Sequence, residues 1–128
     1  MTYLEKAKDI YRMVSEGKLL EAFDKYYAEN VIMQELGEQP RLGKAVNREF
    51  EMAFVNNVKE VHSLGITSIA SNELEGIVFI ENWFDATYKN EVRIIVKQVS
   101  VQRWEGDFIV HEKFYHNNYP NNNEPVVV

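Results

Sequence analysis

The spacing of hydrophobic positions changes near residue 57 and divides the chain into a helical part and a β-rich part. Before that point, apolar side chains recur every three or four residues, which is typical of helices that bury one face. This pattern predicts three helices, and a short apolar run before the third predicts a strand. The predicted helices cover residues 3–16, 19–30 and 43–55, and the strand covers residues 31–35.

Beyond residue 57 the pattern is that of strands. Runs rich in Val, Ile and aromatic residues, separated by turn-forming residues, predict strands over residues 58–71, 76–88, 92–104 and 108–116. The last two flank a short connection around Gly106, which predicts an antiparallel hairpin. Helices first and an antiparallel meander last is an α+β order.

The strand predicted over residues 92–104 carries apolar side chains on both faces. One face holds Ile95, Val99 and Val101 in alternation with Arg and Lys side chains, whose long stems can lie over apolar surface. A strand of this kind is usually covered on both faces. We therefore expect helices on one face and a second copy of the chain, or a loop, on the other. The pattern predicts a homodimer through the outer face of the sheet.

Two features of the helices lead to specific expectations. Thr2 and Glu5 have the spacing of a capping box at the start of the first helix. The apolar stripes of the three helices predict a set of largely buried residues, namely Ile10, Phe23, Phe50 and Phe54.

Length and composition limit the classes of function. The 128 residues suit one domain, which we place at residues 1–118, followed by an Asn- and Pro-rich tail at 119–128. A net charge of −6 with scattered Lys and Arg argues against nucleic acid as a partner. The absence of cysteine excludes disulfides and thiolate metal sites. No apolar run reaches the ~18 residues of a membrane span, and the charged N-terminus lacks a signal-peptide core, so we expect a cytoplasmic protein without membrane contact.

Two segments, residues 26–51 and 103–117, resemble the nuclear-transport-factor-2-like superfamily, the α+β cone fold that ketosteroid isomerase shares with the SnoaL-like cyclases. The first segment contains a Pro-Arg-x-Gly turn before the third helix, and the second contains a closing hairpin with a terminal aromatic pair. The resemblance implies three N-terminal helices packed on a curved, mostly antiparallel sheet around an internal pocket. It also implies chemistry without a cofactor.

The resemblance implies roles for particular residues. Glu35 stands at the place of the isomerase base, Ser100 at that of an oxyanion-hole carboxylate, and His111 near the acid–base group of the cyclases. Tyr11 is one residue from the position of a hydrogen-bonding tyrosine. The resemblance further places four ligand-binding side chains in the pocket, namely Trp83, Asp85, Gln98 and Tyr115.

Three of these assignments have alternatives. Glu35 shares a face with apolar residues, where burial would raise the pKa of its carboxyl toward neutrality, but the strand could also end before it and leave it on a surface loop. Alternation permits His111 to face either the pocket or the outside. Asp85 could serve as a second carboxylate of the site, or pair with an arginine on a neighbouring strand.

Two functions follow from these expectations. The first is a cofactor-independent isomerase, cyclase or dehydratase in which Glu35 moves a proton of a small apolar carbonyl compound while Tyr11, Ser100 or His111 hydrogen-bonds the enolate. The second is a non-catalytic module that binds a small apolar molecule or supplies a dimerisation surface. The three histidines come from separate elements, so the sequence gives no support for a metal site.

Overall fold

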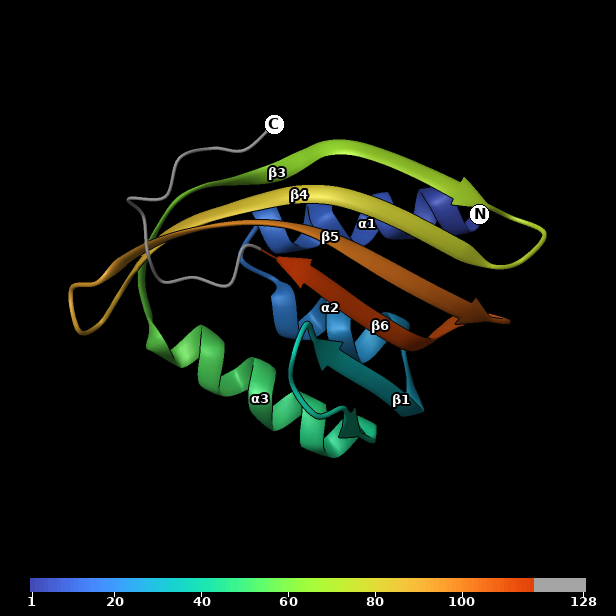
Figure 1. Cartoon of the computed structure of the whole chain (residues 1–128), viewed down its shortest axis with the longest axis horizontal. Coiled ribbons are helices and arrows are strands. Elements are labelled where there is room, and N and C mark those ends of the chain that lie inside the picture. The colour runs from blue at the N-terminus through green and yellow to red at the C-terminus, as the bar shows by residue number, and fades with distance from the viewer. Residues whose placement is uncertain (117–128) are drawn as a thin grey trace.

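A computed structural model describes residues 1–116, and Figure 1 shows how its elements are arranged. The predicted tail, residues 119–128, lies outside the described residues. In chain order the elements are α1 (Tyr3–Ser15), α2 (Leu19–Tyr26), β1 (Tyr27–Glu35), β2 (Arg41–Leu42), α3 (Lys44–Asn57), β3 (Val58–Asn72), β4 (Ile77–Tyr88), β5 (Arg93–Glu105) and β6 (Phe108–His116).

The strands form one curved six-stranded sheet in the order β2-β1-β6-β5-β4-β3. Strands β3 to β6 make the predicted antiparallel meander, whereas β1 runs parallel to its neighbour β6. Figure 1 shows α1 and α2 behind the sheet and α3 beside β1 at one end. The predicted α+β class, with three N-terminal helices on a mostly antiparallel sheet, is confirmed.

The prediction of local structure was least accurate between the second and third helices. Helix α2 ends at Tyr26, and β1 begins at Tyr27 rather than at residue 31. The early start of β1 is a tertiary effect, because Tyr27 pairs with Ile109 of β6. A short strand that was not predicted, β2, pairs with β1 through Leu42 opposite Ile32.

The hydrophobic core lies between the inner face of the sheet and helices α1 and α2. Ile10 and Phe23 are buried there, as their helical stripes predicted. The capping box is confirmed as well, since Thr2 Oγ1 accepts from the backbone N–H of Glu5 at 3.1 Å and Glu5 Oε1 accepts from that of Thr2 at 3.1 Å.

Helix α3 packs differently from the prediction. Phe50 is 42% exposed, and Phe54 is only partly buried. The prediction for Phe50 was wrong because α3 turns Asn47, its one buried residue, and Glu51 toward the protein instead. The Phe50 ring lies under the guanidinium of Arg41, whose carbon is 3.7 Å from the ring centroid.

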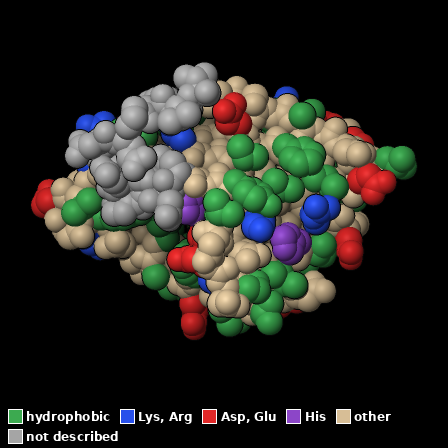
Figure 2. Space-filling model, in the orientation of Figure 1, with side chains coloured by type: hydrophobic (Ala, Val, Ile, Leu, Met, Phe, Trp, Pro, Cys, Tyr) green, Lys and Arg blue, Asp and Glu red, His purple; other side chains and the backbone are tan. Residues whose placement is uncertain are grey.

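Alternate residues of β5 lie on opposite faces of the sheet, as the sequence pattern predicted. Ile94, Ser100, Gln102 and Trp104 are buried on the inner face, below the helices. The outer face carries apolar side chains next to Lys and Arg, and Figure 2 shows this mixed surface from the front. No helix among the described residues is long and apolar enough to cross a membrane.

Candidate functional site

The helices and the inner face of the sheet line a partly open cavity of about 470 Å³. Most of its wall is apolar, with aromatic rings from all three helices and from β1, β4 and β6. Besides three tyrosines, its polar side chains are Glu35, Glu51, Asn82, Gln98, Gln102, Glu112 and His116. A largely apolar cavity with a few convergent polar groups is the usual form of a small-molecule site.

Glu112 of β6 is the most deeply buried of these polar groups, with 2% of its surface exposed. The hydroxyl of Tyr27 donates to its Oε1, and Gln102 Nε2 donates to its Oε2 at 3.1 Å. The amide of Gln102 is itself oriented, because its oxygen accepts from the indole Nε1 of Trp104 at 3.1 Å and an indole N–H can only donate. Both oxygens of Glu112 are therefore held in place.

Burial controls the proton affinity of two carboxyl groups. Desolvation raises the pKa of Glu112 to about 7, although the hydrogen bonds from Tyr27 and Gln102 oppose this change. Desolvation also raises the pKa of Glu51 to about 7, and repulsion from Glu112 acts in the same direction. Both groups can therefore exchange a proton near neutral pH, as acid–base catalysis requires.

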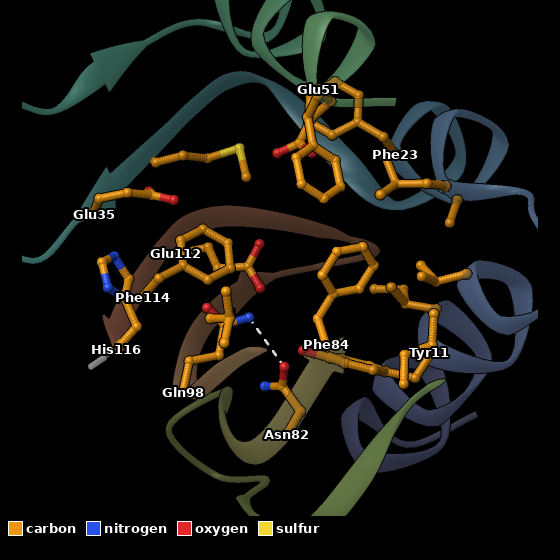
Figure 3. A pocket seen from close by; sticks show the side chains of 18 of the residues that line it. Tyr11, Phe23, Glu35, Glu51, Asn82, Phe84, Gln98, Glu112, Phe114 and His116 are labelled. Atoms are coloured by element: carbon orange, nitrogen blue, oxygen red, sulfur yellow. Dashed lines mark hydrogen bonds between the residues drawn. The ribbon is translucent and has the colours of Figure 1, made fainter. Parts of the chain in front are cut away.

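Glu35 lies at the cavity with a cationic partner. Its Oε2 is 3.3 Å from Arg41 Nη1, and the glutamate side chain is 23% exposed. Arg41 is held by Asn47, whose Oδ1 accepts from the arginine Nε at 3.1 Å. Figure 3 shows Glu35, Glu51 and Glu112 turning their carboxyl groups toward the same space.

Two pairs of neutral side chains also lie at the cavity. The Tyr11 hydroxyl lies 3.5 Å from the Oγ of Ser100, and burial raises the pKa of Tyr11, so this phenol remains protonated. Gln98 Nε2 donates to Asn82 Oδ1 at 3.0 Å, which joins β5 to β4 across the sheet (Figure 3).

The structure brings together only part of the predicted site. Tyr11, Glu35, Trp83 and Gln98 line the cavity, and the fully buried Ser100 contacts Tyr11. The other predicted residues, His111, Asp85 and Tyr115, do not line it.

A β-bulge in β6 explains the position of His111 and Tyr115. Arg103 pairs with His111, whereas the next residue, Trp104, pairs with Ile109, so Val110 is the extra residue. Ile109 and Glu112 are consequently both buried. Regular alternation along the strand would have put these two residues on opposite faces. His111 lies on the outer face, where burial and the neighbouring Arg103 and Lys113 lower its pKa.

Asp85 pairs with an arginine on a neighbouring strand, which is the alternative considered from the sequence. Its Oδ2 accepts from Arg93 Nη2 at 2.7 Å on the outer face of the sheet. On β4, Asn82 and Phe84 point into the cavity (Figure 3), and Trp83 and Tyr88 also line it. The ring of Trp83 lies against Gly65 of β3, and its Nε1 donates to Ser63 Oγ at 3.0 Å.

The sequence interpretation missed Glu51 and Glu112. The sequence gives a weak indication for Glu112. In a strand it lies on the same face as Phe114, within an apolar run, which is compatible with an inward position. Glu51 follows Asn47 by four residues and precedes Phe54 by three, which places all three on one helical face. No group of three His, Cys, Asp or Glu side chains suited to a metal ion occurs within residues 1–116.

Comparison with known proteins defines the class of the fold. No sequence-family profile matches the chain, and no curated protein matches it in sequence. A proposed SnoaL-like polyketide cyclase from Mesorhizobium loti is similar in structure, with a TM-score of 0.76 and 26% identity over 90% of this chain and 99% of that one. A proposed isomerase from Bacillus subtilis has a TM-score of 0.76 at 15% identity, covering 91% of this chain and 90% of that chain. An epoxide hydrolase from M. tuberculosis has a TM-score of 0.75 at 11% identity, covering 92% and 84%.

The protein is thus an α+β cone with an internal cavity that contains carboxyl groups. Solved structures of the same shape are described as SnoaL-like, ketosteroid isomerase-like and NTF2-like. The chain has the fold of the nuclear-transport-factor-2-like superfamily, in agreement with the resemblance in its sequence.

Proposed function

We propose that the cavity is the active site of a cofactor-independent isomerase, cyclase or dehydratase that acts on a small apolar carbonyl compound. The observation that carries this proposal is the buried carboxyl of Glu112, which is oriented by Tyr27 and Gln102 inside a mainly apolar cavity. Keeping a carboxyl group in such a place is costly for folding. A catalytic role gives a reason for it to be there.

In this proposal Glu35 is the general base and Glu112 is the general acid. Glu35, paired with Arg41, takes a proton from the carbon next to the substrate carbonyl. Protonated Glu112 donates its proton to the carbonyl oxygen, which yields the neutral enol. Where a carbon–carbon double bond is conjugated with this enol, Glu35 returns the abstracted proton to the far carbon, and the enol hydroxyl returns its proton to Glu112 as the carbonyl re-forms, which completes an isomerisation. Two carboxyl groups in different environments are a common basis for such a division.

Tyr11 supports the same reaction as a neutral hydrogen-bond donor. Its buried hydroxyl, next to Ser100, remains protonated and can stabilise negative charge that develops on the substrate oxygen. Two structural neighbours of the same fold are described as a proposed isomerase and a proposed SnoaL-like polyketide cyclase. Since one fold hosts many activities, these names support the reaction class and leave the substrate open.

Proton exchange in heavy water tests the proposal without knowledge of the substrate. Wild-type protein should exchange the protons next to the carbonyl of small ketones such as cyclohexanone and benzylacetone, as followed by proton NMR. Glu112→Gln should slow this exchange by roughly 10²–10⁴-fold, the usual contribution of a positioned acid or base. The matched control is Glu105→Gln at the exposed end of β5. Equal exchange in wild type and Glu112→Gln would contradict the assignment of Glu112.

A non-catalytic binding module is the second candidate, and the mainly apolar wall of the cavity favours it. Such a module would bind the ketones, which shifts in the NMR signals of cavity residues would report, without exchanging their protons. Glu35→Gln separates binding from catalysis. In an enzyme, loss of this base should stop proton exchange of the ketones while their binding persists.

We also propose that the protein is a homodimer through the outer face of the sheet. Phe79 is 44% exposed there, and a shallow groove lined by Phe79, Val99 and Ala70 crosses the face. Lys97 and Arg103 alternate with Val99 and Val101 on this face of β5, so their stems could cover the edge of an interface. The cytoplasmic location remains a prediction from the sequence.

A further inference from the structure

The charges around the cavity do not balance within the described residues. Of the three carboxyl groups that line it, Glu35 pairs with Arg41, and Glu112 accepts hydrogen bonds from neutral donors. Within residues 1–116 Glu51 makes no hydrogen bond and no ion pair, although the charge of Arg41 favours its ionised form. Its carboxyl nevertheless points into the cavity (Figure 3).

The position of Glu51 follows from the packing of α3. Asn47, one turn before it, is fully buried and donates to the backbone oxygens of Arg41 and Gly43, which fixes this face of the helix against the protein. Glu51 is therefore held toward the cavity, where its side chain is partly buried. Removing part of the water around a carboxylate is costly unless a cation or a hydrogen-bond donor replaces that water, so the missing partner of Glu51 is informative.

Aromatic rings surround the same space. Phe54, on the next turn of α3, packs against Phe84 with the ring centroids 5.3 Å apart and against Tyr88 at 6.3 Å. Phe23 and Tyr27 are stacked at 4.6 Å. The faces of such rings are electronegative and attract cations, most strongly where water is excluded.

We propose that the ligand of this cavity carries a positively charged nitrogen, as an amine or a quaternary ammonium group on an apolar body, which Glu51 and the aromatic rings hold. This inference rests on the cavity of the proposed function and narrows its substrate class to carbonyl compounds whose apolar body carries such a cation. The cation would supply the partner that Glu51 lacks. A neutral ligand of the same shape would fill the apolar space and leave that carboxyl unpaired.

The protonation of the cavity sets the pH dependence of cation binding. The titratable or charged side chains around Glu51 come from several elements, namely Tyr11, Tyr27, Glu35, Arg41, Tyr88, Glu112 and His116. Burial raises the pKa of Glu51 and of Glu112 to about 7, so both are neutral well below that pH and ionised above it. Affinity for a cation should therefore increase from about pH 6 to about pH 8.

A pair of probes with the same shape and different charge tests the inference. The probes are phenyltrimethylammonium and its uncharged isostere tert-butylbenzene, and binding is followed by NMR titration of the cavity residues. At about pH 8 the cation should bind roughly tenfold more tightly than the isostere, since a carboxylate and ring faces act together. At about pH 6 this preference should be lost, while the affinity for the isostere should not change.

Two variants assign the effect to Glu51. Glu51→Gln should remove the preference for the cation and retain the isostere, whereas Glu49→Gln, an exposed position on the same helix, should leave both affinities unchanged. His116→Asn should retain the pH dependence, because the carboxyl groups cause it. A thermal melt of each variant checks that it is folded.

The outcomes separate this inference from the proposed function. Equal or tighter binding of tert-butylbenzene, or no binding of either probe at millimolar concentration, would overturn the inference. Ketone exchange that depends on Glu112 would still support the proposed function in that case. A preference for the cation that survives Glu51→Gln would also overturn it.

Discussion

The hydroxyl of Tyr27 donates to Oε1 of Glu112 inside the protein, and both side chains are almost completely buried. The two residues stand on neighbouring parallel strands, β1 and β6, whose register shifts between Tyr27 and Ile32. Burial and the proximity of Glu112 raise the pKa of Tyr27 well above its usual value, so the phenol stays protonated as a donor. The proton that moves near neutral pH is therefore that of the carboxyl.

This arrangement predicts how stability depends on pH. The folded-state pKa of Glu112 is raised from 4.5 to about 7, so its contribution is fully present below pH 4.5 and is lost as pH rises through 7. At 1.36 kcal/mol per pH unit, the difference corresponds to roughly 3 kcal/mol by pH 8. Glu51 acts in the same direction. Urea unfolding from pH 5 to pH 8 should show a decrease of this order.

Glu112→Gln should remove much of that decrease, because a neutral amide has no proton to lose. The variant should be at least as stable as wild type at pH 8. The control is Glu105→Gln, at an exposed position, which should follow the wild-type profile. Identical profiles for Glu112→Gln and wild type would show that the carboxyl is not buried as described.

The hydrogen bonds of Asp9 predict that the free energy of unfolding decreases in acid. Its Oδ2 accepts from the Tyr26 hydroxyl at 2.5 Å, and Arg12 Nη2 lies 2.6 Å from its Oδ1. These hydrogen bonds, that of Tyr26 first, lower the pKa of Asp9 from 3.8 to about 2, so the stability they contribute is present above pH 3.8 and is lost as pH falls through 2.

Asp9→Asn should lower the free energy of unfolding at pH 7 by about 1–2 kcal/mol, measured by urea denaturation. We discount Arg12 in this figure, because its side chain is 56% exposed and water screens such a pair. Asp107→Asn is the control, since Asp107 is 85% exposed in its pair with Lys6 and should contribute little. A loss as large for Asp107→Asn would contradict the role of the buried Tyr26 hydroxyl.

Gly65 allows the ring of Trp83 to lie directly on β3. A Cβ at this position would be 2.5 Å from the Cη2 atom of Trp83, closer than such atoms approach. Gly65→Ala should therefore displace the indole and lower the free energy of unfolding by about 1–3 kcal/mol. The Trp83 fluorescence, recorded in a Trp104→Phe background, should shift.

Ser63→Ala is the matched comparison for Gly65→Ala. It removes the acceptor of the indole N–H and leaves room for the ring. We expect a smaller loss, about 1 kcal/mol, with the ring still in place. If Gly65→Ala leaves the emission of Trp83 unchanged, the ring does not depend on the glycine.

The proposed dimer predicts the effect of a charge on the outer sheet face. Val99→Lys should convert a dimer into a folded monomer, because an obligate interface excludes an unpaired cation. Light scattering gives the mass, and circular dichroism shows whether the fold persists. Glu75→Lys, in the turn between β3 and β4, should remain dimeric. A wild-type protein of monomeric mass at micromolar concentration would contradict the proposal.

The sequence alone determined most of the secondary structure and the class of fold. The capping box at Thr2, the helix stripes through Ile10 and Phe23, and the hairpin around Gly106 depend on neighbours within a few residues, and the structure confirms each of them. Local spacing contains this information because helical and strand periods are properties of the backbone itself.

Tertiary structure decided which side chains reach the cavity. The bulge at Val110 reversed the faces of β6, so Glu112 is buried and His111 lies outside. The orientation of α3, held by Asn47, turned Glu51 inward and left Phe50 partly exposed. A shift of one residue in strand register, or a rotation of one helix about its axis, changes the cavity wall without changing local periodicity. The strand register and the helix rotation depend on contacts between segments far apart in sequence. Local sequence patterns therefore do not predict them.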